Sequence, residues 1–122
     1  MKSGSGKILI IEDEKPLARA LELKLVHEGF EVITLSSGEG FWDYIEKGKI
    51  FLIICDLVMP KFDGFQILEK LKENKIQIPV IVLTNLGQTE DEKRVRKLGA
   101  NEFFVKSDTS LSKLVDYIKN KI

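Results

Sequence analysis

Apolar and polar residues follow two different patterns along the chain. Short apolar runs rich in β-branched residues predict strands, because such side chains pack well on the pleated surface of a sheet. Longer segments with apolar residues three and four positions apart predict amphipathic helices between the strands. The predicted strands are Lys7–Ile11, Glu31–Leu35, Phe51–Cys55, Val80–Leu83 and Phe103–Val105.

Local signals mark the ends of several predicted helices. Pro16 suits the first turn of the first helix, and Gly29 is suited to end it. The second helix is predicted from about residue 39 to residue 47. The last helix is predicted from an apolar stripe, which consists of Leu111, Leu114, Val115, Ile118 and Ile122.

Capping-box spacing marks the starts of the third and fourth helices. Asp63 is followed three positions later by Gln66, and Thr89 by Glu92. In such a box the first side chain accepts a hydrogen bond from the backbone three residues on, and the later side chain reciprocates. We therefore predict that the third helix opens with Asp63 and the fourth with Thr89.

The fourth predicted helix has few apolar side chains with which to hold its place. Val95 and Leu98 are its only sizeable ones. Because each fully buried aliphatic side chain contributes about 1.5–3 kcal/mol, this helix should be weakly anchored compared with the last one. Weakly anchored elements are the ones that move, so we expect this helix to be more mobile than the last one.

The regular alternation of strands and helices predicts one parallel sheet, because parallel strands need helical crossovers. The first, third and fourth runs are almost continuously apolar, as expected of strands covered on both faces. Glu31–Leu35 and Phe103–Val105 suit the edges. We predict a flavodoxin-like (βα)5 fold with strand order 2-1-3-4-5 and helices on both faces. This domain is predicted over residues 7–122, after a flexible leader at residues 1–6.

Charge and cysteine content narrow the expected partners and compartment. Nineteen basic residues balance nineteen acidic ones, so neither direct nucleic-acid binding by this domain nor attraction to a membrane surface is expected. No apolar run approaches the roughly 18 residues that a membrane span needs. The lone Cys55 cannot form an intrachain disulfide, which favours a reducing, cytoplasmic location. We expect Cys55 to be a small core residue.

Polar side chains stand just past four of the five predicted strands. Glu12 and Asp13 follow the first strand, Asp56 the third, Thr84 the fourth and Lys106 the fifth. Ligands of open parallel sheets bind beyond the carboxyl ends of the strands, at the point between the first and third strands where the chain order reverses. These side chains are therefore expected to lie close together.

The three carboxylates at this point suggest a metal ion. Glu12, Asp13 and Asp56 would repel one another, and one of them would be forced to take up a proton in a partly dehydrated cleft. A divalent cation would remove the repulsion. All-oxygen ligands suit Mg²⁺ first and Mn²⁺ second, and no His or Cys stands among these positions to suggest zinc.

The same set of groups suits phosphoryl transfer to a carboxylate. Asp56 would be the nucleophile and would become an acyl phosphate. The metal ion and Lys106 would neutralise the phosphoryl oxygens, and the hydroxyl of Thr84 would donate a hydrogen bond to one of them.

Four blocks of the sequence resemble a known family. In order and spacing, ILIIEDE, CDLVMPKFDG, PVIVLTN and GANEFFVKS resemble the signature blocks of the receiver domain of two-component response regulators, from about Lys7 to the C-terminus. The resemblance implies that Asp56 accepts a phosphoryl group from the phosphohistidine of a sensor histidine kinase or a phosphotransfer protein. It also implies that Asp13, Asp56 and the main-chain carbonyl of Val58 bind Mg²⁺, with Glu12 acting through a metal-bound water.

The resemblance implies a conformational switch rather than an enzyme. Thr84 and Lys106 would hold the phosphoryl group, and Phe103 would be the aromatic residue whose rotamer follows phosphorylation. The domain would assist its own phosphorylation and dephosphorylation without turning over an external substrate. It would control an output, and phosphorylation would favour a homodimer through the fourth and fifth helices.

The chain departs from the family pattern after Lys106, where Ser107 replaces the usual proline. A cis bond before a residue other than proline costs about 2.5–4 kcal/mol, so we expect a trans path. Val58 and Leu86 are both apolar, at positions that in the family tune the access of water to the phosphoryl group. We therefore expect slow self-dephosphorylation.

Two other functions stay open at this stage. A phosphatase of the haloacid dehalogenase type also uses an aspartate at a strand end, but it needs a second aspartate two positions on, where this chain has Val58. A pseudo-receiver would keep the fold as a docking domain without phosphorylation. A dinucleotide site is excluded because no G-x-G-x-x-G follows the first predicted strand.

Overall fold

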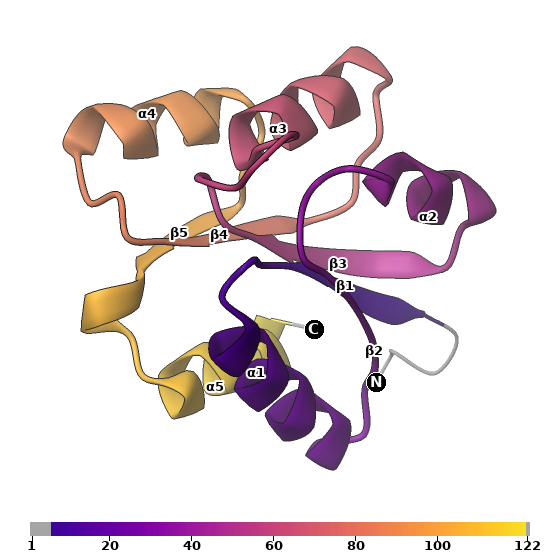
Figure 1. Cartoon of the computed structure of the whole chain (residues 1–122), viewed down its shortest axis with the longest axis vertical. Helices are drawn as coiled ribbons and strands as arrows, with labels where there is room; N and C mark the ends of the chain where they lie inside the picture. The colour runs from indigo at the N-terminus through magenta and orange to yellow at the C-terminus, as the bar shows by residue number, and fades with distance from the viewer. Residues whose placement is uncertain (1–5, 122) are drawn as a thin grey trace.

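The computed structural model describes residues 6–121, and within them five strands alternate with five α-helices (Figure 1). The strands are β1 Lys7–Ile11, β2 Glu31–Leu35, β3 Ile50–Cys55, β4 Val80–Thr84 and β5 Glu102–Val105. The helices are α1 Lys15–His27, α2 Phe41–Lys47, α3 Gly64–Glu73, α4 Thr89–Lys97 and α5 Leu111–Lys121. The predicted flexibility of residues 1–5 and the predicted place of Ile122 on the last helix lie outside the described residues.

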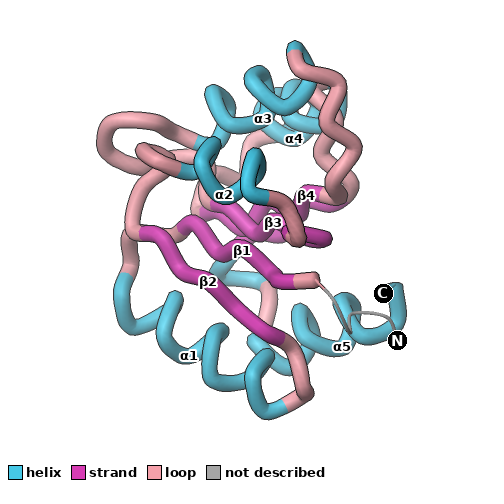
Figure 2. Tube along the Cα trace, turned by 90° about the vertical axis from the view of Figure 1, so that its right-hand side faces the viewer, coloured by secondary structure: helices cyan, strands magenta, loops and turns pink. Residues whose placement is uncertain are grey.

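All five strands are parallel, and their order across the sheet is β2-β1-β3-β4-β5. Helices α1 and α5 cover one face of the sheet, and α2, α3 and α4 cover the other (Figures 1 and 2). The predicted flavodoxin-like architecture is confirmed, with the second and fifth strands at the edges as expected. None of the described helices has both the length and the apolar character that a membrane crossing requires.

The sheet separates two apolar cores because successive side chains of a strand point to opposite faces. Along β1, Ile8 and Ile10 pack in the core beneath α1 and α5. Leu9 and Ile11 pack in the core that α2, α3 and α4 cover. These four side chains are fully buried, as are most of β3 and β4, which explains the nearly continuous apolar character of the central runs.

The predicted ends of the first and third helices agree with the structure. Pro16 lies in the first turn of α1, and Gly29 follows its end with a φ of 98°, a conformation that glycine adopts without strain. At the start of α3, the amide of Gln66 donates to Oδ1 of Asp63 at 3.0 Å. The amide of Asp63 in turn donates to Oε1 of Gln66 at 2.9 Å. The predicted capping box of α3 is confirmed.

The predicted capping box of α4 is wrong. Gln88 occupies the N-cap position with an extended backbone and makes no side-chain cap hydrogen bond, and Thr89 is already helical. The N-terminus of α4 instead carries three acidic residues in its first turn, Glu90, Asp91 and Glu92. Their charges interact favourably with the exposed amides at the positive end of the helix dipole. Acidic residues are therefore expected in this turn without a capping box, and Glu92 falls three positions after Thr89 for this reason.

Several element boundaries differ from the prediction by one or two residues. Helix α2 begins at Phe41 because Gly40 is in the left-handed region, with a φ of 87°, and cannot continue a helix backwards. Strand β4 extends to Thr84, which pairs with Val105 of β5. A short 3₁₀ turn that was not predicted, Lys106–Asp108, joins β5 to the loop before α5. Thr84 is therefore the last residue of β4, and its pairing with β5 fixes its position at the carboxyl end of the strands.

Candidate functional site

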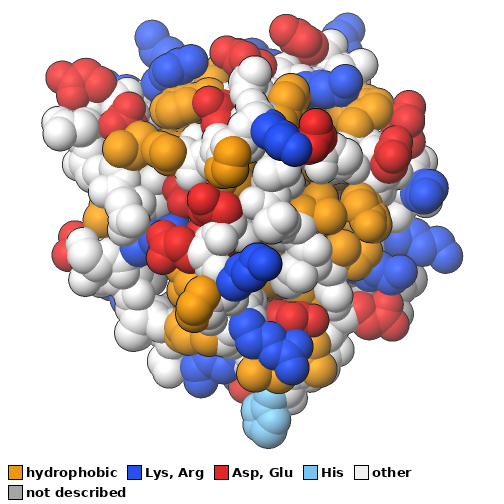
Figure 3. Space-filling view, viewed as in Figure 1, with side chains coloured by type: hydrophobic (Ala, Val, Ile, Leu, Met, Phe, Trp, Pro, Cys, Tyr) orange, Lys and Arg blue, Asp and Glu red, His pale blue; other side chains and the backbone are white. Residues whose placement is uncertain are grey.

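Acidic side chains gather at the carboxyl edge of the sheet, where β1 and β3 end (Figure 3). Glu12 and Asp56 are buried, with 4% and 5% of their surfaces exposed, while Asp13 is exposed. Carboxylate oxygens of these three residues lie within 4.8 Å of one another. The structure thus brings together the three carboxylates that the sequence pattern placed at this point.

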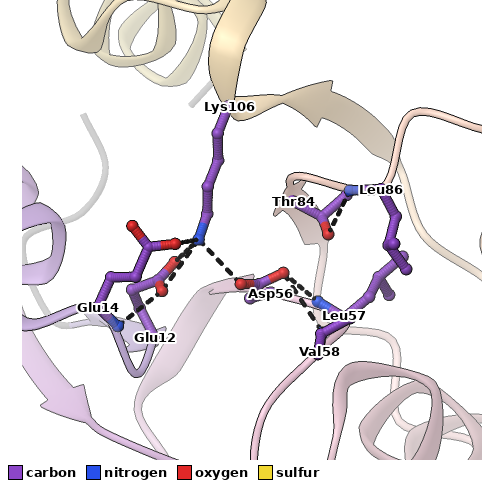
Figure 4. A network of polar contacts seen from close by, with 8 residues as sticks. All are labelled: Glu12, Glu14, Asp56, Leu57, Val58, Thr84, Leu86 and Lys106. Atoms are coloured by element: carbon purple, nitrogen blue, oxygen red, sulfur yellow. Dashed lines mark hydrogen bonds and ion pairs between the residues drawn. The ribbon is translucent and has the colours of Figure 1, made fainter.

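Lys106 reaches into this acidic group from the end of β5 (Figure 4). Its Nζ lies 2.9 Å from Oδ2 of Asp56, 3.0 Å from Oε1 of Glu12 and 2.7 Å from Oε2 of Glu14. Burial by itself would lower the pKa of Lys106, but the hydrogen bonds to these three carboxylates outweigh it and hold the pKa above its ordinary value. Lys106 is therefore a fixed positive charge in this structure.

Glu14 was missed by the sequence analysis. It stands at the N-cap of α1, and its carboxylate contacts Lys106 across 92 positions of sequence. Its amide donates to Oε2 of Glu12 at 2.9 Å, which also helps to orient the buried carboxylate. Three consecutive acidic residues, Glu12 to Glu14, indicated an excess of negative charge after the first strand. Nothing in the sequence showed which of these carboxylates Lys106 would reach.

Glu12 lies in an environment that disfavours its charge. Burial raises the pKa of the Glu12 carboxyl, against the opposing effects of the Glu14 amide and the Lys106 ammonium. The neighbouring negative charge of Asp56 raises it further. A buried carboxylate with a raised pKa beside other carboxylates gains from added positive charge.

The carboxylate of Asp56 is fixed by the backbone that follows it. Its Oδ1 accepts hydrogen bonds from the amides of Leu57 at 2.6 Å and Val58 at 3.4 Å (Figure 4). The chain then turns back sharply, and the amide of Gly64 donates to the carbonyl of Leu57 at 3.2 Å. A side chain at Gly64 would overlap the carbonyl oxygen of Asp56. Gly64 therefore adds to the cap that Asp63 provides, because a residue without a side chain lets α3 begin against the backbone of the site.

Thr84 and Lys106 lie on either side of Asp56 (Figure 4). Thr84 is fully buried, and its Oγ1 accepts a hydrogen bond from the amide of Leu86 at 3.2 Å. Because a hydroxyl has one donor and two acceptor positions, accepting this bond leaves the proton of Thr84 free to donate. The Thr84 hydroxyl is thus available to an oxygen placed beside Asp56.

The remaining predicted site residues border the site rather than enter the ionic network. The side chain of Val58 is 59% exposed, and Leu86 is half-buried. Phe103 is half-buried on β5 and packs against the core that α4 covers. The Lys106–Ser107 peptide is trans, so the expected path is confirmed and serine in place of proline is compatible with the contacts of Lys106.

Cys55 directly precedes Asp56 at the end of β3 and is fully packed in the core. Burial raises the pKa of its thiol to about 12, with a smaller contribution from the negative charge of Asp56. Such a thiol is almost entirely protonated at neutral pH and is neither a nucleophile nor a metal ligand. The expected role as a small core residue is confirmed.

Comparisons with known proteins agree with this arrangement. The sequence model described as "Response regulator receiver domain" matches residues 8–119. The chain belongs to this family. The receiver domain is similar to a probable transcriptional regulator, ycf27, of Porphyra purpurea, with 36% identity over 87% of this chain and 43% of the relative. It is also 33% identical, over 82% of this chain and 42% of the relative, to the alkaline phosphatase synthesis transcriptional regulatory protein PhoP of Bacillus subtilis.

Solved structures resemble the receiver domain over nearly its whole length. A receiver domain of a Francisella response regulator superposes with a TM-score of 0.86 at 26% identity, covering 94% of each chain. A response regulator receiver domain protein from Clostridium thermocellum superposes with a TM-score of 0.81 at 33% identity, covering 94% of this chain and 92% of the other. The chain spans less than half the length of the curated relatives it matches.

The donor set of the site fits a hard divalent cation. Glu12, Asp13 and Asp56 present oxygen ligands within 4.8 Å of one another. Among the residues that the structure describes, Lys106 is the one cation that contacts the buried pair, Glu12 and Asp56. Three carboxylates, those of Glu12, Glu14 and Asp56, pair with this one ammonium group, and that of Asp13 lies beside two of them. Mg²⁺ prefers such oxygen ligands and commonly keeps several waters, which suits a site open on the Asp13 side.

Proposed function

We propose that this receiver domain accepts a phosphoryl group on Asp56 from the phosphohistidine of a sensor histidine kinase or a phosphotransfer protein. The observation that carries the proposal is the setting of Asp56. Its carboxylate is held by the amides of Leu57 and Val58 and by Lys106, and the free proton of Thr84 lies on its other side. The phosphoryl transfer takes place in the cytoplasm, and the domain turns over no external substrate.

The transfer balances as a displacement at phosphorus. A carboxylate oxygen of Asp56 forms the new P–O bond while the P–N bond to the donor imidazole breaks. The imidazole leaves with the electron pair and takes up a proton. Lys106 and the Thr84 hydroxyl hold the oxygens of the transferred group, and these preorganised donors stabilise charge without having to reorient.

Asp13, Asp56 and the main-chain carbonyl of Val58 would hold Mg²⁺, with Glu12 acting through a bound water. The ion would neutralise the phosphoryl oxygens that approach the carboxylates. The closeness of the three carboxylates and the raised pKa of Glu12 support this assignment. Mn²⁺ would substitute, because it accepts the same ligands.

The proposed output is a change at the β4–β5 side of the domain. A phosphoryl group that binds the Thr84 hydroxyl pulls Thr84 toward Asp56, and the loop that carries Leu86 moves with it. Phe103 then changes rotamer and fills the space that Thr84 leaves. The moved surface of α4 and α5 then forms a homodimer and controls the output. Because the curated relatives are more than twice as long as the matched region, we place the controlled output outside the receiver domain.

The proposal is tested by incubating the protein with acetyl phosphate and Mg²⁺ and measuring its intact mass. The expected result is a gain of one phosphoryl group that is lost in Asp56→Asn and in the presence of a chelator. Asp63→Asn is a matched control, since it changes an aspartate outside the ionic network and should leave the gain intact. No gain, or a gain that persists in Asp56→Asn, would overturn the proposal and favour a pseudo-receiver.

The phosphorylated form should persist for minutes rather than seconds, because apolar Val58 and Leu86 offer an attacking water no hydrogen bond. Val58→Thr keeps the shape of the side chain and adds a hydroxyl, so it should shorten the lifetime. Val26→Thr, at a comparably exposed valine of α1, should not. The decay is followed by intact mass after removal of the phosphodonor, and a wild-type lifetime of seconds would contradict the expectation.

A further inference from the structure

A second concave site lies between the loop after β2 and the loop after β3. The cavity has a volume of about 370 Å³, which is in the range of small-molecule sites. Its principal lining residues are Phe41, Trp42, Phe62, Glu39, Lys61 and Lys70, which we call the aromatic pocket. None of these residues belongs to the ionic network around Asp56.

Three aromatic rings form the wall of the aromatic pocket. Phe41 is fully buried and stacks on Phe62, with the ring centroids 5.7 Å apart and the planes at 26°. Trp42 meets Phe41 edge to face at 5.8 Å. Trp42 and Phe62 are only half-buried, so their rings remain partly available. The sequence indicated only packing around the second helix for Trp42, because Phe62 lies 20 positions further along the chain.

Two lysines provide the charge of the aromatic pocket. Nζ of Lys70 lies 4.9 Å from the ring centroid of Trp42, and Lys70 forms no ion pair within the described part of the chain. Lys61 pairs with Glu39 at 3.2 Å, but both side chains are about two-thirds exposed, so that pair is weak and easily exchanged. The ammonium group of Lys70 has three donors, so it can pair with an anion while it lies over the indole.

Glycines keep the mouth of the aromatic pocket open and its two loops close together. The amide of Gly38 donates to the carbonyl of Phe62 at 3.0 Å, and a side chain at Gly38 would overlap that carbonyl. At Gly40 a side chain would face open space, but the φ of 87° suits glycine alone. The pocket is therefore built by a close backbone approach, with no side chain covering it from the glycine side.

From these features we infer that the aromatic pocket binds a small aromatic anion, such as a carboxylate joined to a phenyl ring by a short alkyl chain. The ring of the ligand packs against Trp42 and Phe62. Its carboxylate pairs with Lys70 and also replaces Glu39 as the partner of Lys61. A neutral aromatic molecule lacks the ionic contacts, and a simple inorganic anion lacks the ring contacts. The loop that carries Lys61 and Phe62 continues directly from Asp56 and Val58, so the ligand contacts the same loop as the proposed phosphorylation site.

The test uses 3-phenylpropionate as the probe and two-dimensional ¹H–¹⁵N NMR as the readout. Trp42 is the only tryptophan of the chain, so its indole N–H gives a single, assigned signal in the pocket. We expect a saturable shift of this signal and of the Lys61 and Phe62 amides, with a dissociation constant on the order of 1 mM, as for other fragment-sized ligands. 3-Phenylpropanol, which has the same ring without the charge, should bind about tenfold more weakly.

Variants separate this pocket from general binding to basic surface. Lys70→Gln keeps most of the side-chain stem and removes the charge, and it should weaken the probe about as much as removing the carboxylate does. Lys113→Gln, at an exposed lysine of α5, should leave the affinity unchanged. Equal affinity for acid and alcohol, shifts scattered over the surface, or an unchanged affinity in Lys70→Gln would each overturn the inference. None of these results depends on whether Asp56 is phosphorylated.

Discussion

Helices α4 and α5 cover opposite faces of the sheet beside β5 (Figure 1), yet they are held in different ways. The buried residues of α5 are Leu114, Val115 and Ile118, whereas Val95 is the single buried residue of α4. The apolar attachment of α4 is therefore small, as its sequence predicted. Burial of apolar surface is a non-directional force that resists any displacement, so α5 is the firmer of the two helices.

Polar contacts supply much of the attachment of α4. Arg96 pairs with Glu102 of β5 at 2.7 Å, and the guanidinium of Arg94 lies 4.0 Å from the ring centroid of Phe65 on α3. Nζ of Lys72 donates to the carbonyl of Lys97 at 2.9 Å. All three contacts lie on the surface, where water can replace either partner at little cost. A helix held in this way can shift and find new partners, while one held by a core cannot.

The largest expected effect comes from the core contact of α5. Ile118→Ala should lower the free energy of unfolding by roughly 2–5 kcal/mol, because it leaves a cavity at a fully buried position. Ile118→Val, which removes one methylene group, should lower it by about 0.5–1.5 kcal/mol. Urea denaturation measures both. A loss below about 1 kcal/mol for the alanine variant would mean that α5 is not anchored by its core face.

Hydrogen exchange compares the two helices directly in the unmodified protein. Amides in the middle of α4 should exchange at least about tenfold faster than those in the middle of α5, because local opening exposes less apolar surface. Exchange followed residue by residue by NMR supplies the rates. Equal protection of the two helices would contradict the difference in anchoring.

The polar attachment of α4 should matter for mobility more than for stability. Arg96→Gln removes the ion pairs to Glu92 and Glu102, and we expect it to cost less than about 1 kcal/mol of unfolding free energy while speeding the exchange of α4. Arg19→Gln, which breaks an exposed pair on α1, is the control and should leave α4 exchange unchanged. If Arg96→Gln does not change the exchange of α4 either, the contact to β5 does not hold this helix.

The smallest expected effect is the pH dependence of that contact. Burial alone would raise the pKa of Glu102, but the hydrogen bond from Arg96 and the amide of Phe103 outweigh it and lower the pKa below the ordinary 4.5. The stabilisation is therefore present above the unfolded-state value and is lost as pH falls through the folded-state value. The stability difference between the wild type and Arg96→Gln should shrink below pH 4.5. A difference that grows there would show that the pair does not set this pKa.

Much of the fold and of the site could be predicted because both follow from local patterns and one topological rule. Periodicity indicated the elements, and the strand order placed Glu12, Asp13 and Asp56 at one point. The contact between Glu14 and Lys106 could not be predicted in the same way, since it depends on the path of a long side chain between loops 92 positions apart. The close approach of Gly64 to the backbone of Asp56 likewise depends on how the β3–α3 loop packs.

The wrong capping box of α4 has a related cause. The N-cap is the residue at which the backbone leaves the extended region, and Gln88, with a φ of −75° and a ψ of 141°, is that residue. The spacing of Thr89 and Glu92 is compatible with two neighbouring starts of the helix. Val95 packs in the core, and such a tertiary contact is not encoded in the spacing of Thr89 and Glu92.

The buried thiol of Cys55 is a built-in probe for local opening of the sheet at β3. It is the only cysteine of the chain and is fully packed one residue before Asp56, with a pKa that leaves almost no thiolate at neutral pH. A thiol-specific reagent can react only when β3 separates from its neighbours and the side chain reaches water. The rate of labelling therefore times the excursions of the strand that carries the phosphoacceptor, without any added probe.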